Sequence, residues 1–260
     1  MKKLILMLAA ILCLSPVLFD RAYALSDNTY GFYCVRNKEH KQPKLDSSQR
    51  FIENYDAYYV DKNHGDDVEE KVIYLTFDAG YENGNIERIL DTMKAEGVSG
   101  TFFILENLIK KNPDLVIRMA NEGHTVANHT SKHKDMTQVD DLESFRCELE
   151  SLSALYEEAT GKKMSMLYRP PEGKFDERSL SFAQSLGYKT IFWSFAYADW
   201  DNNKQPSAHV AMKKIMDNIH NGEIMLLHPT STTNADILGD VIQILKSQGY
   251  RFGEISELWA

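Results

Sequence analysis

The sequence predicts an α/β fold in which a parallel sheet is wrapped by helices. From Lys71 onward, short runs rich in β-branched and aromatic residues alternate with amphipathic stretches, about seven times in all. Several of the amphipathic stretches end in glycine, as helices often do. This alternation is typical of strands joined by helical crossovers. Both a doubly wound open sheet and a closed barrel satisfy the pattern.

The elements follow one another in a regular order. Seven runs are predicted strands: KVIYLTF (71–77), GTFFIL (100–105), HTVAN (124–128), MLYR (166–169), TIFWS (190–194), EIMLL (223–227) and, more weakly, RFGEI (251–255). Four stretches between them have clear helical periodicity: NIERILDTMKAEG (85–97), PDLVIRMANEG (113–123), DERSLSFAQSLG (176–187) and DILGDVIQILKSQG (236–249).

The N-terminal segment 1–24 is predicted to be a signal peptide. Lys2 and Lys3 precede an apolar stretch, and Ala22–Ala24 supplies small residues at the two positions that a signal peptidase reads. We place the cleavage after Ala24. An uncleaved membrane anchor is the alternative, although the apolar run is short for a spanning helix. The prediction is therefore an exported protein whose mature form does not contact a membrane.

Residues 25–70 are predicted to form an irregular N-terminal extension and linker, followed by one domain over 71–260. The extension is polar and aromatic, and it ends in the charged stretch DKNHGDDVEEK. Cys34 and Cys147 remain after cleavage of the leader. In an exported chain they could pair or stay free, and they lack the spacing of a metal site.

Composition excludes some functions. The 260 residues include 43% hydrophobic and 26% charged residues, as in ordinary soluble globular proteins. The formal net charge is −9, whereas phosphate binding needs a basic face. We therefore expect no nucleic-acid partner.

Polar side chains follow five of the predicted strands. Asp78 follows the first strand, His129 the third and Arg169 the fourth, while Asp199 follows the fifth and His228 the sixth. In a parallel barrel the carboxyl ends of the strands share one face, where active sites are built. The sequence therefore predicts that these five side chains lie close together.

His129 and His133 lie four positions apart in the sequence. If that segment were helical, both imidazoles would lie on one side and could hold one metal ion. Capping or surface histidines are the alternative, and Thr130 stands where a zinc protease would have its glutamate. A strand-end carboxylate nearby favours zinc or a similar divalent ion.

The other strand-end groups also have more than one interpretation each. Asp78 is a metal ligand or a general base, or it caps a turn. Arg169, held by the two following prolines, keeps a carboxylate ionised or forms a structural ion pair. His228 is structural unless a carboxylate such as Asp199 orients it.

Together, a base, a metal and an acid fit the attack of water on an amide or ester carbonyl. Trp193 and Trp200 either stack on a sugar ring or pack in the core. A glycosidase with two carboxylates is disfavoured, because no strand-end acid beyond Asp199 accompanies Asp78.

Five short motifs, in this order, resemble those of the NodB-type polysaccharide deacetylases, carbohydrate esterase family 4. They are TFDAG, HTSKH, RPPEG, ADW and LLH, and the resemblance extends from about Lys71 to the C-terminus. It implies a distorted (β/α) barrel of about seven strands. The stretches YENGN, GFYCVRNKEHKQP and YDAYYV also resemble the branch of delta-lactam-biosynthetic de-N-acetylases.

This resemblance implies a hydrolase that removes acetyl groups from N-acetylmuramic acid in peptidoglycan glycan strands. An N-acetylmuramoyl-L-alanine amidase would first strip the peptide, and the freed amine would then close the muramic delta-lactam of spore cortex. The implied location is the cell envelope, the extracellular space or the forespore intermembrane space. Two alternatives stay open: a deacetylase of N-acetylglucosamine in peptidoglycan or chitin-like oligomers, and a catalytically silent glycan-binding protein.

The resemblance also implies a role for each motif residue. Asp78 would be the base, and His129 and His133 would hold a divalent metal, with zinc the expected ion. Arg169 would orient Asp78. Asp199 would orient His228, which would protonate the leaving amine.

Three further residues are expected to contact the substrate. A backbone N–H near Glu172 would stabilise the oxyanion, and Trp200 and Tyr81 would lie beside the sugar. Ala79 departs from the family pattern, in which a second acid at this position is the third metal ligand. We therefore expect a lower metal affinity.

Overall fold

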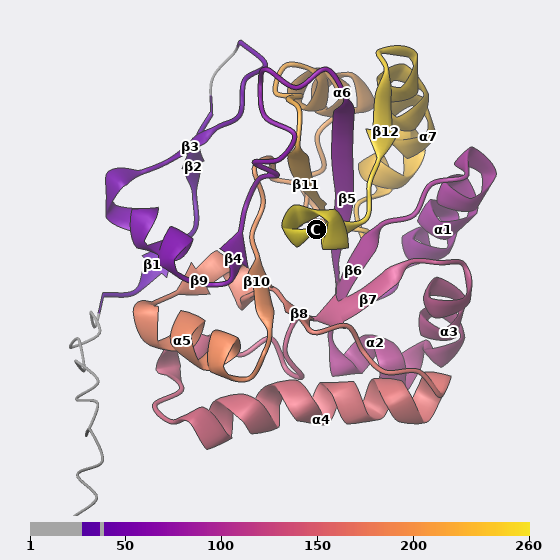
Figure 1. The fold of residues 1–260 in the computed structure, drawn as a ribbon. Helices are drawn as coiled ribbons and strands as arrows, with labels where there is room; N and C mark the ends of the chain where they lie inside the picture. The colour runs from indigo at the N-terminus through magenta and orange to yellow at the C-terminus, as the bar shows by residue number, and fades with distance from the viewer. Residues whose placement is uncertain (1–27, 37–38) are drawn as a thin grey trace, which may run out of the picture.

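The computed structural model describes residues 28–36 and 39–260. The predicted signal peptide lies outside the described residues. The main sheet runs in the order β11–β5–β6–β7–β8–β10, with all neighbours parallel (Figure 1). A further strand, β12, pairs with the first residues of β5. The prediction of about seven parallel strands is confirmed: β5 (Lys71–Ala79), β6 (Thr101–Ile104), β7 (Thr125–Asn128), β8 (Leu167–Tyr168), β10 (Lys189–Ile191), β11 (Glu223–Leu227) and β12 (Tyr250–Phe252).

The sheet curls into a distorted barrel. Beyond β10, Phe195 forms a parallel bridge with Met225 of β11. The Leu226 N–H donates to the Phe195 carbonyl at 2.8 Å, and the Ser194 N–H donates to the Ile224 carbonyl at 3.0 Å. These bonds connect the segment after β10 to β11, the first strand in the order. The architecture is therefore a distorted barrel and not a doubly wound open sheet.

Seven α-helices lie among the described residues, and they cover the outside of the sheet (Figure 1). The predicted stretches correspond to α1, α3, α5 and α7. The last of these begins before the predicted start at residue 236, because Ser231 caps it and accepts from the Asn234 N–H. The bounds are α1 (Asn85–Glu96), α2 (Glu106–Lys111), α3 (Pro113–Asn121), α4 (Leu142–Thr160), α5 (Glu177–Ser185), α6 (Ala208–Met216) and α7 (Thr232–Ser247).

Strand β5 separates two apolar layers. Ile73, Leu75 and Phe77 pack outward against the helices, whereas Val72 and Tyr74 pack inside the barrel. The inner layer is closed at the amino ends of the strands by Ile255 and Leu258 of η4 (Ile255–Trp259). Because strand side chains alternate, Asp78 falls on the inner face at the opposite end of the barrel.

The N-terminal extension packs against the barrel and is more ordered than predicted. Its backbone forms β1 (Tyr30–Gly31), β2 (Cys34–Val35), β3 (Lys44–Leu45) and the 3-10 helix η1 (Ser47–Asn54). A further strand, β4 (Ala57–Tyr58), pairs in parallel with β10 and so extends the main sheet. β1 pairs with β9 (Lys174–Phe175), next to the loop that follows β8. The domain boundary at residue 70 stays a prediction.

Both cysteines that the structure describes are free. Cys34 is partly buried, and its thiol lies 3.4 Å from the Ser194 carbonyl oxygen. Cys147 is exposed on α4. Within residues 28–36 and 39–260, no helix is both long and apolar enough to span a bilayer.

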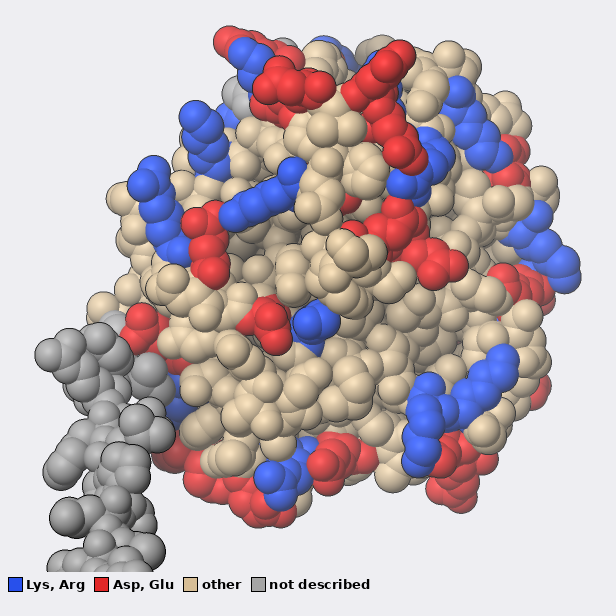
Figure 2. Space-filling model, in the orientation of Figure 1, with Lys and Arg blue, Asp and Glu red and all other residues tan. Residues whose placement is uncertain are grey.

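On the face seen in Figure 2, acidic and basic side chains are interspersed. Exposed ion pairs of the described chain include Lys62–Glu53 and Arg251–Glu70. This face offers no continuous basic field of the kind that binds a phosphate backbone.

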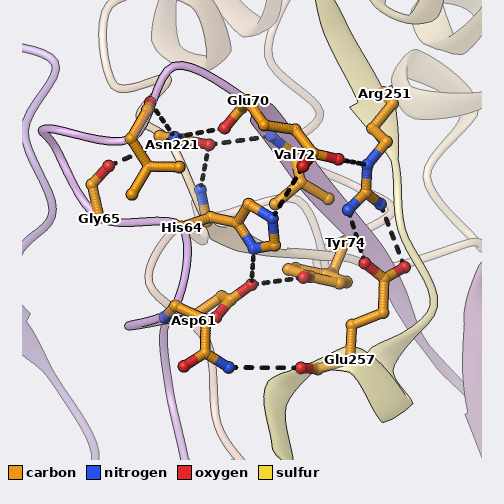
Figure 3. Close-up of polar contacts among 12 residues, drawn as sticks. Asp61, His64, Gly65, Glu70, Val72, Tyr74, Asn221, Arg251 and Glu257 are labelled. Carbon is orange, nitrogen blue, oxygen red and sulfur yellow. Dashed lines mark hydrogen bonds and ion pairs between the residues drawn. The ribbon is translucent and has the colours of Figure 1, made fainter. Parts of the chain in front are cut away.

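Asn221 joins the linker to the barrel at the amino ends of the strands (Figure 3). Its Oδ1 accepts from the Val72 N–H at 2.9 Å. Its Nδ2 donates to three carbonyl oxygens of the linker, those of Gly65, Val68 and Glu70, at 3.3, 3.1 and 2.8 Å. One buried amide thus satisfies backbone groups of both segments.

Three carboxylates near Asn221, those of Asp61, Glu70 and Glu257, form further polar contacts at this end of the barrel (Figure 3). The buried Asp61 Oδ2 lies 2.6 Å from His64 Nδ1 and accepts from the Tyr74 hydroxyl at 2.5 Å. Glu70 binds Arg251 of β12, whose guanidinium also binds Glu257 of η4. The linker, β5, β12 and the C-terminal turn are therefore held as one unit.

We predict that Asn221→Ala lowers the free energy of unfolding by about 2–3 kcal/mol, because it leaves the buried Val72 N–H without its partner and removes the bonds that hold the linker. Urea unfolding measures this, and limited proteolysis should show cleavage within residues 62–70. Asn218→Ala is the matched control, since its side chain makes a single bond to the Lys214 carbonyl. An Asn221 variant as stable as the control would contradict the role of this residue.

Candidate active site

Asp78 lies at the end of β5 and is held by Arg169. Arg169 Nη1 donates to Asp78 Oδ1 at 2.9 Å, and the carboxylate is only 11% exposed. Burial would raise the pKa of Asp78, but the positive charges that His129, Arg169 and His228 carry when protonated outweigh it and lower the pKa. Arg169 stays charged at any physiological pH. The carboxylate is therefore ionised and able to accept a proton.

Arg169 itself is fully buried at the end of β8. Its Nη2 donates to Thr76 Oγ1 at 2.9 Å and to the Phe192 carbonyl at 3.0 Å, and its Nε donates to the Ile191 carbonyl at 2.9 Å. The guanidinium also lies over the Phe103 ring, 4.2 Å from its centroid. These contacts from the neighbouring strands hold the guanidinium in place, and the contribution of the following prolines stays a prediction.

His129 and His133 come together, but not on a helix. Both lie in a loop after β7, and Thr130 and His133 have left-handed φ values of 71° and 57°. A β-branched residue rarely adopts this conformation, so the backbone at Thr130 is strained. The segment is therefore not helical, and the condition under which the spacing alone would bring the rings together is not met. The two imidazole rings nevertheless meet, with centroids 5.0 Å apart.

The surroundings of His129 fix its protonation. Its Nδ1 lies 2.9 Å from the Arg169 carbonyl oxygen, which can only accept, so Nδ1 carries the hydrogen. Burial is the largest influence on its pKa, which is lowered to about 4, so the ring is neutral at pH 7. The Nε2 lone pair then faces Asp78 Oδ2 at 3.6 Å.

Two acceptor atoms that face each other in a buried site favour a cation or a proton donor between them. The residues present therefore fit a divalent metal held by the two imidazoles. Among the described residues, however, no group of three or more His, Cys, Asp or Glu side chains could hold an ion together. Ala79 is fully buried in the outer apolar layer and offers no donor atom. Position 79 therefore contributes no ligand to an ion held between the two imidazoles.

His228 follows β11 and is oriented by Asp199. Its Nδ1 lies 2.7 Å from Asp199 Oδ1, and its backbone N–H donates to Asp199 Oδ2 at 2.9 Å. Burial lowers the pKa of His228, but the hydrogen bond and charge of Asp199, with the charge of Asp78, raise it overall. His228 therefore retains a proton at higher pH than an ordinary histidine and can act as an acid.

One pocket of about 720 Å³ collects most of the predicted residues. Asp78, His129, His133 and His228 line it. Arg169 and Asp199 do not line the pocket themselves. Arg169 is hydrogen-bonded to Asp78, and Asp199 is hydrogen-bonded to His228. The predicted substrate contacts also line it: Glu172, Trp200 and Tyr81.

The rim of the pocket is aromatic. Tyr81 and Trp200 are each 60% exposed, and the Trp200 ring lies 6.0 Å from the His228 ring. The loop after β8 forms another part of the pocket wall. In it, Glu172 has a left-handed φ of 56°, and its carboxylate binds Lys174 at 2.8 Å. Gly173 follows with φ 63°, and a Cβ there would lie 2.6 Å from the Trp193 ring. The loop after β8 therefore needs glycine to pass beneath Trp193.

Sequence reasoning missed two polar residues behind the pocket. Thr76 accepts from Arg169 and donates to the Met225 carbonyl at 2.8 Å. Its place two residues before Asp78, on the same face of the strand, was a usable signal. Asn234 donates to Asp199 Oδ2 at 2.6 Å from α7, and no local pattern in the sequence points to it.

Comparison with known proteins gives a consistent answer. The sequence model of the family described as polysaccharide deacetylase matches residues 65–191. The chain is 38% identical over 239 residues to the peptidoglycan-N-acetylmuramic acid deacetylase PdaA of Bacillus subtilis, covering 92% of this chain and 89% of that protein. This chain belongs to the polysaccharide deacetylase family.

Solved structures of the family agree. The structure of Bacillus subtilis PdaA, a family 4 carbohydrate esterase, superposes with a TM-score of 0.84 at 37% identity, covering 90% of this chain and 98% of that one. A more distant relative is the peptidoglycan-N-acetylglucosamine deacetylase PgdA of Listeria monocytogenes. It is 34% identical over 189 residues, which are 73% of this chain and 39% of PgdA. The resemblance inferred from the five motifs is confirmed.

We predict that Arg169→Met destabilises the fold by about 3–5 kcal/mol, because Asp78 is left as an unpaired buried charge. Adding Asp78→Asn should recover part of this loss, since the uncompensated charge is then removed. Urea unfolding of the two single variants and the double variant measures the coupling. Arg146→Met, at the surface of α4, is the control and should cost less than about 1 kcal/mol. Strictly additive costs would contradict a direct Arg169–Asp78 interaction.

Proposed function

We propose that this chain removes the acetyl group from N-acetylmuramic acid in peptidoglycan. The observation that carries the proposal is one pocket lined by an ionised carboxylate, Asp78, and by a histidine of raised pKa, His228. The 38% identity to an enzyme named for this substrate supports it.

The proposed reaction uses the two groups as base and acid. Asp78 takes a proton from the water that attacks the acetyl carbonyl carbon. His228 gives its proton to the amide nitrogen as the C–N bond breaks, so that acetate and a free amine leave. Arg169 keeps Asp78 ionised and fixed, and Asp199 keeps Nδ1 of His228 protonated so that Nε2 carries the proton to be transferred.

A divalent metal, zinc in our proposal, would be held by His129 and His133 and would supply positive charge to the carbonyl oxygen. The neutral His129 ring and its fixed tautomer suit this role. We also propose that a backbone N–H near Glu172 assists at the same oxygen, and that Tyr81 and Trp200 contact the sugar.

The biological setting is part of the proposal. An N-acetylmuramoyl-L-alanine amidase would supply the peptide-stripped substrate, and the freed amine would close the muramic delta-lactam of spore cortex. We further propose that residues 1–24 direct export, so that the enzyme acts in the cell envelope, outside the cell or in the forespore intermembrane space.

One feature of the pocket favours a second candidate substrate, N-acetylglucosamine. Muramic acid carries a lactyl carboxylate once the peptide is gone, yet no Lys or Arg of the described chain lines the pocket. N-acetylglucosamine has no such carboxylate and needs no cation. The two sugars must therefore be compared directly, and the same assay tests a catalytically silent glycan-binding protein.

We predict acetyl loss from muramic acid when the mature chain is incubated with zinc and amidase-treated peptidoglycan fragments. Mass spectrometry follows the loss, and fragments that keep their peptides should remain unchanged. Asp78→Asn and His129→Ala should each lower the rate by at least about a hundredfold, whereas Asp201→Asn, an exposed acid nearby, should not. Acetyl loss from glucosamine alone would favour the second substrate, and no loss from either sugar would favour a silent binder.

We also predict a bell-shaped dependence of kcat on pH. Activity needs Asp78 ionised and His228 protonated, so it falls in acid as Asp78 is protonated and in alkali as His228 loses its proton. Because the pKa of Asp78 is lowered and that of His228 raised, the plateau is wide.

Asp199→Asn removes the charge that raises the pKa of His228, while burial still lowers it. The alkaline limb should therefore move to lower pH in this variant. Asp201→Asn should leave both limbs in place. An unchanged alkaline limb in the Asp199 variant would show that His228 is not the acid.

A further inference from the structure

Asn234 lies in the first turn of α7, only 1% exposed, and connects three parts of the site. Its Nδ2 donates to Asp199 Oδ2 at 2.6 Å and to the His228 carbonyl at 3.2 Å. Its Oδ1 accepts from the Tyr197 hydroxyl. Every polar atom of this buried amide thus has a partner.

We propose that Asn234 is a positioning residue, which aims the Asp199 carboxylate at the imidazole of His228. Tyr197 acts with it by fixing which way the amide points. The inference rests on the proposed function, in which His228 is the acid.

The hydrogen bonds around Asp199 explain why a neutral donor is needed. Asp199 Oδ1 is occupied by the His228 ring, and Oδ2 accepts from the His228 backbone N–H and from Asn234. A buried carboxylate needs donors on both oxygens. Asn234 supplies one without adding a charge next to His228.

The direction of the amide is determined by Tyr197. Burial raises the pKa of Tyr197, so its hydroxyl stays protonated and donates to Asn234 Oδ1. Nδ2 must then face Asp199, because an amide turned the other way would put two acceptors together. A hydrophobic residue at 197 could not impose this orientation.

The main chain around Asp199 is tied to the same helix. Gln205 Nε2 donates to the Asp199 carbonyl at 2.7 Å, and the Ser231 hydroxyl donates to Gln205 Oε1. Ser231 Oγ also accepts from the Asn234 N–H at 3.0 Å, which is the cap of α7. Capping uses only the backbone of Asn234, so its side chain is left for Asp199.

The charged groups that act on His228 are Asp199, Asp78 and Arg169, from three different strand ends. Tyr197 is the other titratable group that faces Asn234, and it stays neutral. A change at Asn234 to another neutral residue therefore alters the direction of Asp199 without changing the number of charges near His228.

Two variants test the proposal in the full mature chain with zinc and amidase-treated peptidoglycan. Asn234→Leu keeps the branched shape of the side chain and the backbone cap but removes the amide donor and acceptor. We expect kcat to fall about tenfold or more at every pH, with KM changed less than about twofold. Asn234→Asp donates only when protonated, so its rate relative to wild type should rise as the pH is lowered.

Thermal unfolding at each pH shows whether either variant fails to fold, and Asp236→Asn is the control. Asp236 lies on the same helix but pairs with Arg88 at the surface. A rate for Asn234→Leu within twofold of wild type would overturn the proposal, as would a ratio for Asn234→Asp that does not depend on pH.

A spectroscopic measurement keeps the inference separate from the proposed function. At a pH where His228 is neutral, the ¹⁵N shifts of its ring report the tautomer. We expect the Nδ1–H tautomer in the wild type and a mixed population in Asn234→Leu, because Asp199 is then free to turn away. An unchanged tautomer would overturn the inference, even if the wild type acts on neither sugar.

Discussion

The structure depends on one buried charge, the guanidinium of Arg169. A fully buried cation needs partners for its donors, and here they come from several strands. Thr76 and Asp78 belong to β5, and two carbonyl oxygens lie at the end of β10. The carbonyl of Arg169 also accepts from His129, after β7. Through its side chain and its carbonyl, Arg169 thus links the carboxyl ends of β5, β7, β8 and β10, so the fold and the base are held by the same contacts.

The base and the acid of the proposed reaction each have a buried partner of opposite charge, which shifts the pKa of the base down and that of the acid up. Asp78 faces Arg169, which lowers its pKa, while His228 faces Asp199, which raises the pKa of the imidazole. Burial alone would push both pKa values the other way. Arg169 and Asp199 do not line the pocket, whereas Asp78 and His228 do. A substrate in the pocket therefore contacts the two groups whose pKa values are shifted and not the partners that shift them. This arrangement fits a family of deacetylases.

The sequence predicted the site residues that directly follow a strand, because the apolar runs that mark the strands are recognisable in it. Apolar runs located the seven barrel strands, and the polar residues after them located Asp78, Arg169 and His228. Contacts between distant segments were not predictable: β4 joins the sheet through β10, and Asn234 reaches Asp199 from a helix 35 residues further along the chain. The spacing of the histidine pair would bring the rings together only on a helix, whereas in the structure a strained loop does so.

Successive residues at the end of β5 have different roles: Ala79 packs in the apolar core, and Asp78 faces the pocket. Ala79 shares the outer apolar layer with Ile73, Leu75 and Phe77, whereas Asp78 belongs to the inner face. A methyl group is compatible with that layer, and a carboxylate at 79 would be costly to bury unless a cation compensated it. In this chain Ala79 packs in that layer and brings no donor atom to the site, so the metal that we propose for His129 and His133 gains no ligand from this position.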